Sequence, residues 1–212
     1  MEGELLMRSN FDCEPRCYWE HSSAVFHKTR EKHGGLSNMA AGFPLRVNGI
    51  QIRTSEALYQ ACRFPHLPDV QREIIGERSP MTAKMRSKPW RDETRPDWME
   101  VRVKVMRWVL RVKLAQNWEK FSHELLETDN LEIVEKKTRR ADFWGAKVQE
   151  DGSFFGKNVL GRLLMELREQ VRDSGQQSFL EIKPLNISRF DIYGQPIDCI
   201  ILERFQQKVL IL

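Results

Sequence analysis

The sequence lacks the long apolar segments that would place it in a membrane. No uninterrupted apolar run approaches the roughly 18 residues that a membrane-spanning helix needs. The acidic start of the chain also has neither the basic region nor the apolar region of a signal peptide. We therefore expect a cytoplasmic protein with no membrane partner.

The sequence is also poor in metal-binding residues. Its four cysteines are Cys13, Cys17, Cys62 and Cys199, and only the first two are close to each other, in a Cys-x3-Cys pair. Structural zinc sites use about four Cys or His ligands at familiar spacings, and the chain has no Cys-x2-Cys pair and no His-Glu-x-x-His motif. We expect reduced thiols, no metal and no cofactor.

An excess of charge of one sign is missing too, since 34 basic and 30 acidic residues leave a net charge of +4. With 41% hydrophobic and 30% charged residues, the composition is that of an ordinary globular protein. A chain of 212 residues is long enough for one well-buried core. We expect an N-terminal extension over residues 1–22, a single domain over 23–177, and a β-rich appendage over 178–212 that packs on the core.

Basic residues nevertheless gather in two places. The first group is Lys84, Arg86 and Lys88, and the second is Lys136, Lys137, Arg139 and Arg140. Such clusters can meet the phosphates of a nucleotide or a nucleic acid. They can equally be solvated surface, and the sequence does not decide between the two.

A β-hairpin is the clearest local signal. Apolar residues alternate up to Asn48-Gly49 and again beyond it, which is typical of a two-residue type I′ turn. Thr54 or Ser55 can then cap a helix that carries Glu56, and Pro65 should help to end that helix near Phe64.

Most other segments have helical patterns. Short helices are expected between Asp69 and Gly76 and after Ser79-Pro80. Asp97 and Glu100 have capping-box spacing ahead of a long helix with a buried stripe. Further helices are expected over 118–127 and from Asn158 onward, a short strand over 131–135, a linker at 176–178, and β-forming segments at 197–205 and 208–212. The predicted fold is α+β and predominantly α-helical, with a small β-hairpin and short strands.

The segment 56–64 has the densest pattern of polar and apolar residues. In a helix, Glu56, Gln60 and Arg63 fall at i, i+4 and i+7 and share one stripe. Glu56 would lie at the positive end of the helix dipole. The stripe is either a solvated face or part of a site that uses the carboxylate.

Two further segments permit more than one interpretation. Gly156-x-Asn158-x-x-Gly161 is a glycine loop at a helix start, where free N–H groups can bind phosphate, but Asn158 can also be an N-cap and Gly161 a packing residue. It is not a Rossmann fingerprint, because we find no convincing strand before it and no βαβ unit. Asp142 beside Trp144 can orient a ribose and stack a base, or form a turn next to a half-buried core side chain.

Four segments together resemble one family. They are Gly35-Leu36-Ser37-Asn38, the segment 56–64, Asp142-Phe143-Trp144-Gly145, and the segment 156–165 followed by Arg168. In this order they resemble the NADAR family (NAD and ADP-ribose related), also called YbiA-like, over about 26–172. The resemblance implies a YbiA-like single domain that hydrolyses N-glycosidic bonds in ribose phosphates or ADP-ribose adducts. Known branches act on early riboflavin-pathway intermediates or remove ADP-ribose from guanine, the latter opposing a DNA-modifying toxin.

The resemblance also implies a set of site residues. Glu56 and Asp142 would serve as general acid or base and orient the ribose. Lys84, within Met81-Thr82-Ala83-Lys84, would form a Schiff base with the opened sugar, its amine pKa lowered by nearby basic residues. The residues expected to bind substrate are Ser37, Asn38, Tyr59, Gln60, Arg63, Trp98, Trp144, Gly145, Gly156 and Asn158.

The sequence departs from the family pattern at a few positions. Ala57-Leu58 stands where many members have His or Tyr, and Met39 stands where an aromatic residue often follows Ser-Asn. With the segment 62–68, these departures look more like the guanine-deribosylating branch. We therefore expect ADP-ribosylated guanine in DNA or nucleotide as the partner, together with a possible cognate DNA ADP-ribosyltransferase toxin. A riboflavin-pathway glycosidase and a non-catalytic ADP-ribose or nucleic-acid binding module are the alternatives.

Overall fold

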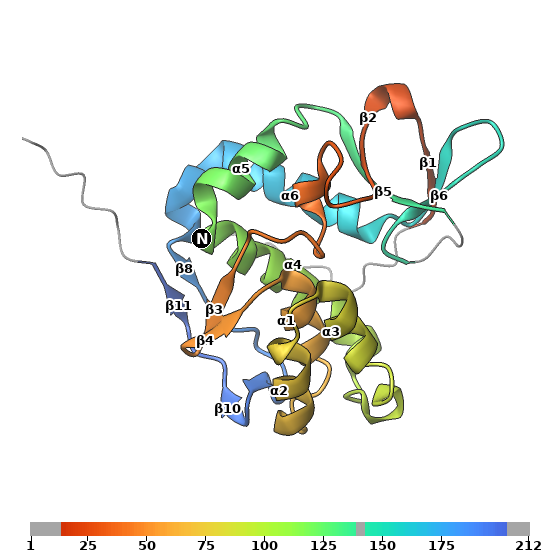
Figure 1. Ribbon diagram of the computed structural model, residues 1–212. Coiled ribbons are helices and arrows are strands. Elements are labelled where there is room, and N and C mark those ends of the chain that lie inside the picture. The colour runs from red at the N-terminus through yellow and green to blue at the C-terminus, as the bar shows by residue number, and fades with distance from the viewer. Residues whose placement is uncertain (1–13, 139–142, 203–212) are drawn as a thin grey trace, which may run out of the picture.

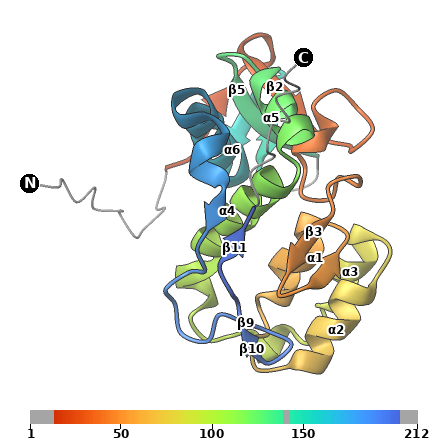
Figure 2. The same cartoon turned by 90° about the vertical axis from the view of Figure 1, so that its left-hand side faces the viewer.

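A computed structural model describes residues 14–138 and 143–202. The long helix α4 (Trp98–Gln116) passes through the middle of the molecule (Figure 1). On one side lie a five-stranded sheet and helices α5 (Trp118–Leu126) and α6 (Val159–Ser174); on the other lie α1 (Ser55–Ala61), α2 (Pro68–Gly76) and α3 (Pro80–Arg86), as Figure 2 also shows. The fold is α+β and predominantly helical, as predicted.

The sheet has the strand order β1-β7-β6-β5-β2. Its strands are β1 (Arg16–Tyr18), β2 (Ser23–Phe26), β5 (Glu132–Lys137), β6 (Ala146–Val148) and β7 (Phe154–Gly156). Strand β5 pairs in parallel with β2 and β6, whereas β7 is antiparallel to both of its neighbours.

Two expectations about this region were wrong. Residues 16–18 were assigned to an extension, yet they form β1 and pair with β7. Three-residue strands are too short to show a period in the sequence. A strand also does precede the glycine motif, because β7 ends at Gly156, although its antiparallel pairing still excludes a βαβ unit.

The predicted hairpin is confirmed as β3 (Leu45–Val47) and β4 (Ile50–Ile52). Asn48 and Gly49 have φ of 48° and 76°, so both turn residues adopt the positive φ of a type I′ turn. The hydroxyl of Thr54 then caps α1 by accepting the Ala57 N–H at 3.3 Å. Helix α1 ends at Ala61, earlier than predicted, because the N–H groups of Arg63 and Phe64 close tighter i to i+3 turns.

Helix caps show where local patterns succeed and fail. Ser79 caps α3 as predicted, its hydroxyl accepting the Thr82 N–H at 3.5 Å. The capping box predicted for α4 was wrong, since the Asp97 carboxylate makes no cap hydrogen bond. It accepts instead from the guanidinium of buried Arg95, with 2.9 Å between Nη2 and Oδ2. An ion pair with a buried cation thus replaces the cap.

The start of α6 is fixed to the sheet by Asn158. This fully buried residue has φ of 48°, and its side chain does not cap the helix. Its amide donates to the Ile133 carbonyl at 2.8 Å and its oxygen accepts the Glu135 N–H at 3.1 Å. A Cβ on Gly161 would lie 2.0 Å from the same Ile133 oxygen, so glycine is required for this close packing.

The C-terminal segment lies against the core through several short elements. The predicted linker forms a 3-10 helix, η4 (Gly175–Phe179), which is followed by β8 (Glu181–Ile182), β9 (Asp191–Ile192), β10 (Gln195–Pro196) and β11 (Ile200–Ile201). Phe179, Ile182 and Ile192 belong to the main hydrophobic cluster. The β-forming run 208–212 and the end of 197–205 lie outside the described residues.

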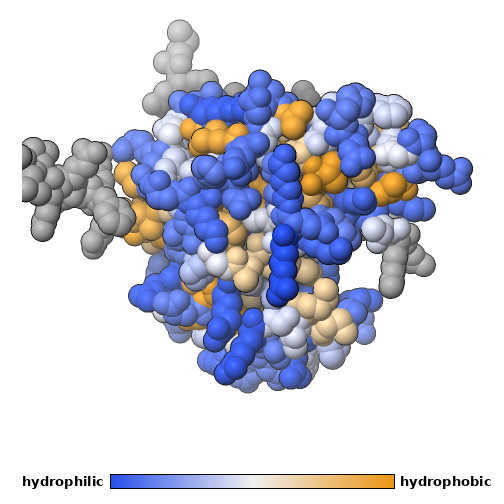
Figure 3. All heavy atoms as spheres, turned by 45° about the horizontal axis from the view of Figure 1, so that its top comes forward, coloured by the Kyte–Doolittle hydropathy of each residue, from blue (hydrophilic) through white to orange (hydrophobic). Residues whose placement is uncertain are grey.

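Three more 3-10 helices complete the described chain: η1 (Glu20–Ser22), η2 (Gly34–Leu36) and η3 (Arg91–Glu93). Within the described ranges, none of the helices combines the length and apolarity that a membrane span requires. The face drawn in Figure 3 is mostly hydrophilic, with hydrophobic residues scattered across it.

Candidate functional site

The centre of the candidate site is the buried carboxylate of Glu56 in the first turn of α1. Glu56 is 7% exposed, so the solvated-face interpretation does not apply. Its Oε1 accepts a hydrogen bond from Gln60 Nε2 at 2.9 Å. Arg63 Nη1 in turn donates to Gln60 Oε1 at 3.1 Å. The predicted stripe of Glu56, Gln60 and Arg63 is therefore a connected hydrogen-bond chain.

The Gln60 amide is held in one orientation from both ends. Its oxygen faces the Arg63 guanidinium and, at 3.0 Å, the Ser87 hydroxyl, so its NH₂ group must face Glu56. Arg63 is anchored further by Thr94 Oγ1, which accepts from Nη2 at 2.8 Å. Because every link is a side chain fixed by another, Glu56 is presented in a defined position.

Lys84 brings an amine to this carboxylate from a different helix. Its Nζ lies 4.0 Å from Glu56 Oε1, and its side chain is 47% exposed against 9% for Glu56. The Ser87 hydroxyl, which lies 2.8 Å from the Lys84 carbonyl, ties the end of α3 to Gln60. The basic neighbours that were expected to act on Lys84 are placed differently, since Arg86 pairs with Glu77 at 2.6 Å.

An aromatic cluster forms the adjoining wall. The ring of Tyr59 lies 5.1 Å from that of Trp98 and 5.6 Å from that of Trp144, and Trp144 meets Phe143 edge to face at 5.1 Å. The Arg63 guanidinium lies 5.7 Å from the Trp98 ring. Burial, and then the charge of Glu56, raise the pKa of Tyr59, so its hydroxyl remains a hydrogen-bond donor. Two indole rings thus contact the phenol, and Phe143 and Arg63 lie against those two rings.

The loop with Ser37 and Asn38 supports α1 through its backbone. The Asn38 carbonyl accepts the Glu56 N–H at 3.1 Å, satisfying a free donor at the helix start. The Ser37 hydroxyl accepts the Met39 N–H at 3.1 Å, and the Asn38 amide donates to the sulfur of Met106. Asn38 Oδ1 is buried without a partner among the described atoms.

Fully buried Lys113 holds this loop from α4. Its Nζ donates to the carbonyls of Gly35 and Ser37 at 2.6 and 3.1 Å, and it lies 3.9 Å from the Phe121 ring centroid. Burial holds the pKa of Lys113 well below its usual 10.5, and Lys120 adds to this while Glu124 opposes it. The amine thus donates to two carbonyls of the loop.

We expect this buried lysine to make the free energy of unfolding depend on pH. Between its lowered folded pKa and 10.5, the unfolded chain binds the proton that the folded chain excludes. The free energy of unfolding should therefore rise with pH across that window, by up to about 1.4 kcal/mol per pH unit, and Lys113→Met should lose this rise.

Urea unfolding of both proteins from pH 7 to 10 measures the effect. Burial also raises the pKa of Cys62, to about 12, and this acts in the opposite sense above pH 9. Cys62 is the same in both proteins, so the difference between their curves isolates Lys113. If the free energy of unfolding changes with pH in the same way in both proteins, Lys113 is not the source of the pH dependence.

Three of the predicted binding residues make contacts that support the fold. The N–H groups of Asn158, Val159 and Leu160 donate to the carbonyls of residues 145, 143 and 144. The helix start is thus occupied by protein rather than open to phosphate. Cβ atoms on Gly145 and Gly156 would lie 2.5 and 2.6 Å from backbone oxygens. Asn158, Gly145 and Gly156 therefore shape the packing beneath Trp144.

Asp142 lies outside the described residues, as do Cys13, Arg139 and Arg140. Of the second basic cluster, Lys137 pairs with Glu135 at 2.9 Å. The geometry of the site accordingly rests on Glu56, Lys84 and the aromatic wall.

Four residues of this site were not predicted from the sequence: Ser87, Thr94, Lys113, and Arg102, whose Cζ lies 3.7 Å from the centroid of the Phe143 ring. Ser87 and Thr94 contact the α1 stripe at Gln60 and Arg63, which lie 27 and 31 residues earlier. Arg102 follows Trp98 by four residues, a spacing that could have placed both on one face of α4. Lys113 gave no such signal, because a lysine in an amphipathic helix is normally assigned to the solvent face.

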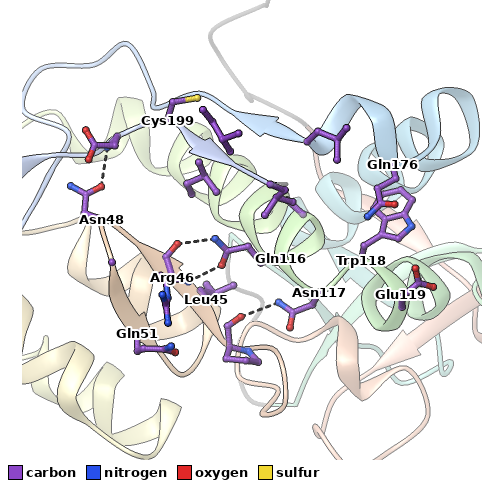
Figure 4. Close-up of a pocket in the computed structure, with 18 of the residues that line it drawn as sticks. Leu45, Arg46, Asn48, Gln51, Gln116, Asn117, Trp118, Glu119, Gln176 and Cys199 are labelled. Atoms are coloured by element: carbon purple, nitrogen blue, oxygen red, sulfur yellow. Dashed lines mark hydrogen bonds between the residues drawn. The ribbon is translucent and has the colours of Figure 1, made fainter. Parts of the chain in front are cut away.

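A hollow lies elsewhere in the described residues, and Glu56, Tyr59 and Lys84 do not line it. It measures about 1160 Å³ and lies between the hairpin, the α4–α5 junction and residues 198–202 (Figure 4). One of its amide side chains is already bound to the backbone, since Gln116 Oε1 accepts from the Arg46 N–H and Gln116 Nε2 donates to the Arg46 carbonyl. The candidate site is at Glu56, where a carboxylate and an amine meet beside aromatic rings.

The chain is similar to several known proteins. The NADAR domain model matches residues 25–172. N-glycosidase YbiA of Escherichia coli is 39% identical over 147 residues, covering 69% of this chain and 86% of that protein. A riboflavin biosynthesis protein of Vibrio vulnificus is 31% identical over 176 residues, covering 80% of this chain but only 45% of its own length.

A solved structure supports the same assignment. The NMR structure of E. coli YbiA matches with a TM-score of 0.61 at 34% identity, over 74% of this chain and 89% of that one. The family match includes Glu56, Lys84, Tyr59 and Trp98 and ends before the C-terminal segment. The chain belongs to the NADAR domain family and has the YbiA-like fold.

Proposed function

We propose that this protein is an N-glycosidase that hydrolyses the bond between ADP-ribose and guanine in modified DNA or nucleotides. The observation that carries the proposal is the meeting of Glu56 Oε1 and Lys84 Nζ at 4.0 Å, beside the wall of Tyr59, Trp98 and Trp144. The relatives named N-glycosidase YbiA give the reaction class. The guanine preference rests on the departures at Met39 and Ala57-Leu58, together with the resemblance of the segment 62–68.

The chemistry required fits these groups. Breaking an N-glycosidic bond develops positive charge at the anomeric carbon, which a nearby carboxylate stabilises. Glu56 has the burial and fixed orientation for this role, and it can also remove a proton from the attacking nucleophile. Aromatic rings such as Trp98 and Trp144 suit the flat faces of a base or sugar. We assign Asp142 to orient the ribose or protonate the departing base.

Lys84 is assigned a covalent role. Its amine would attack C1 of the ribose while the C1–N bond to guanine breaks and guanine takes up a proton. The ring oxygen then leaves C1 as a hydroxyl, which gives an imine. Water hydrolyses the imine, releasing the sugar aldehyde and restoring the amine.

A phosphorylated riboflavin-pathway intermediate is the second candidate substrate. It is favoured by the riboflavin biosynthesis protein of Vibrio vulnificus, although this chain spans under half of that protein. The same carboxylate and amine would act on the same kind of bond. The difference lies in the base that leaves.

The test compares both substrates with one enzyme preparation. An oligonucleotide with ADP-ribose on guanine, free ADP-ribosylated guanosine, and a phosphorylated aminopyrimidine riboside are incubated separately, and the released products are followed by mass spectrometry. We expect release of ADP-ribose from the guanine substrates. Cleavage of the pyrimidine riboside alone would assign the second function, and tight binding without turnover would assign a binding module. A DNA ADP-ribosyltransferase would be the enzyme whose product this protein removes.

A further inference from the structure

Arg102 differs from the other arginines of α4 in having no polar partner among the described residues. Arg107 Nη2 pairs with Glu166 at 3.0 Å, and Arg111 Nη1 donates to Gln170 at 2.7 Å. Arg102 is half-buried, and its Nε is buried without a hydrogen bond. A cation in such a place is unfavourable unless an anion meets it.

Arg102 lies on the face of α4 that is turned toward the candidate site. It lies four residues after Trp98 and four before Met106, so the three share one face of α4. Trp98 packs on Tyr59 with 5.1 Å between ring centroids, and Met106 contacts the amide of Asn38. This face therefore lines the wall that adjoins Glu56.

The guanidinium is also held in a defined plane. Its Cζ lies 3.7 Å from the centroid of the Phe143 ring, a closer contact than any other described between an arginine and an aromatic ring. The positive charge lies near enough to Tyr59 to oppose, with Arg63, the rise in the pKa of that phenol. Stacking engages the flat face of the guanidinium and leaves its N–H edge available for two parallel hydrogen bonds.

We propose that Arg102 binds a phosphate group of the substrate. A phosphate has the negative charge and the paired oxygens that suit the two parallel N–H groups of the guanidinium, here called its fork. Arg–phosphate contacts are commonly bidentate. The inference rests on the proposed function and deepens it, because it makes the phosphate a requirement for binding. Both candidate substrates carry a phosphate, so the residue selects phosphorylated ribosides over unphosphorylated ones.

Binding measurements with Arg102→Gln test the proposal. We expect the dissociation constant of ADP-ribose or ribose 5-phosphate to rise about tenfold to a hundredfold, with binding of unphosphorylated ribose or adenosine unchanged. Arg102→Lys keeps the charge but not the fork, and should fall between wild type and Arg102→Gln. Arg107→Gln, on the same helix but paired with Glu166, is the matched control and should bind as wild type does.

The two ligands identify which phosphate is bound. A loss confined to ADP-ribose assigns Arg102 to the phosphate on the adenosine side of the pyrophosphate, whereas an equal loss for ribose 5-phosphate assigns it to the phosphate on C5 of the reacting ribose. Circular dichroism of each variant checks the fold, and Arg102→Lys supplies the test if Arg102→Gln does not fold. Equal weakening of phosphorylated and unphosphorylated ligands would overturn the proposal, as would failure of the wild type to bind either phosphorylated ligand.

The same experiment separates this inference from the proposed function. Wild-type protein that binds ADP-ribose through Arg102 but cleaves none of the glycosides would leave the phosphate site intact and reject the glycosidase. With an active enzyme, Arg102→Gln should raise KM for the phosphorylated substrate much more than it lowers kcat, because the phosphate is bound before and during the reaction.

Discussion

Glu56→Gln is expected to lower kcat of the glycosidase by about 10²- to 10⁴-fold while the protein stays folded. Glutamine has nearly the same shape, and its amide oxygen can still accept the Gln60 hydrogen bond that Glu56 Oε1 accepts at 2.9 Å. The variant removes the negative charge that would stabilise the anomeric carbon and accept a proton. The effect should therefore fall on chemistry rather than on folding.

Steady-state kinetics with the ADP-ribosylated guanine substrate measures this loss. Glu73→Gln is the matched control, because Glu73 is an exposed carboxylate on the neighbouring helix α2. It should keep wild-type kcat and KM. A Glu56→Gln enzyme that turns over within a fewfold of wild type would remove Glu56 from the chemistry, and a drop in both variants would point to a general effect of charge.

The polar chain on α1 shows how much of the site could be predicted from sequence. Helical spacing placed Glu56, Gln60 and Arg63 on one stripe, and the structure joins all three by hydrogen bonds. Spacing alone could not decide whether that stripe was solvated. Burial depends on α3 packing against α1, a contact between segments with no shared period.

Residues that reach the site from α4 could not be predicted in the same way. Lys113 is buried because its amine donates hydrogen bonds to two carbonyls of a loop 76 and 78 residues earlier. No residue near Lys113 in the sequence indicates these hydrogen bonds. Asn158 shows the opposite error. The sequence suggested a cap or a ligand, whereas its side chain binds the backbone of β5, which lies 23 and 25 residues earlier.

The remaining elements that were not predicted are short strands. The hairpin could be predicted because Asn-Gly demands a particular turn and both flanking strands alternate. Strands β1 and β6 have three residues each and take their place in the sheet from their partners, which are distant in sequence. Tertiary pairing rather than local propensity determines such elements.

Lys84 should become covalently attached to the sugar when the reaction is run in the presence of sodium borohydride. The reagent reduces an imine to a stable amine, so a Schiff base between Nζ and C1 would remain on the protein. Mass spectrometry of the digested protein should find the added sugar on the peptide with Lys84. Substrate and borohydride added separately should leave the peptide unmodified.

The geometry supplies a reason why this amine and not another should react. An ammonium group must lose a proton before it can attack, and Glu56 Oε1, at 4.0 Å, is within reach after a small rotation of the half-exposed side chain. Lys88, exposed just beyond the end of α3, provides a matched comparison. Lys88→Ala should keep both adduct and turnover, whereas Lys84→Ala should lose the adduct and lower kcat by about 10²-fold or more.

Lys84→Arg distinguishes covalent from purely electrostatic action. Arginine keeps the positive charge beside Glu56 but cannot form the imine, because its guanidinium is not deprotonated in proteins. If the amine acts as a nucleophile, this variant should be as inactive as Lys84→Ala. If turnover survives in Lys84→Arg and no adduct is trapped in the wild type, then water attacks the sugar directly, Glu56 activates that water, and Lys84 contributes only its charge.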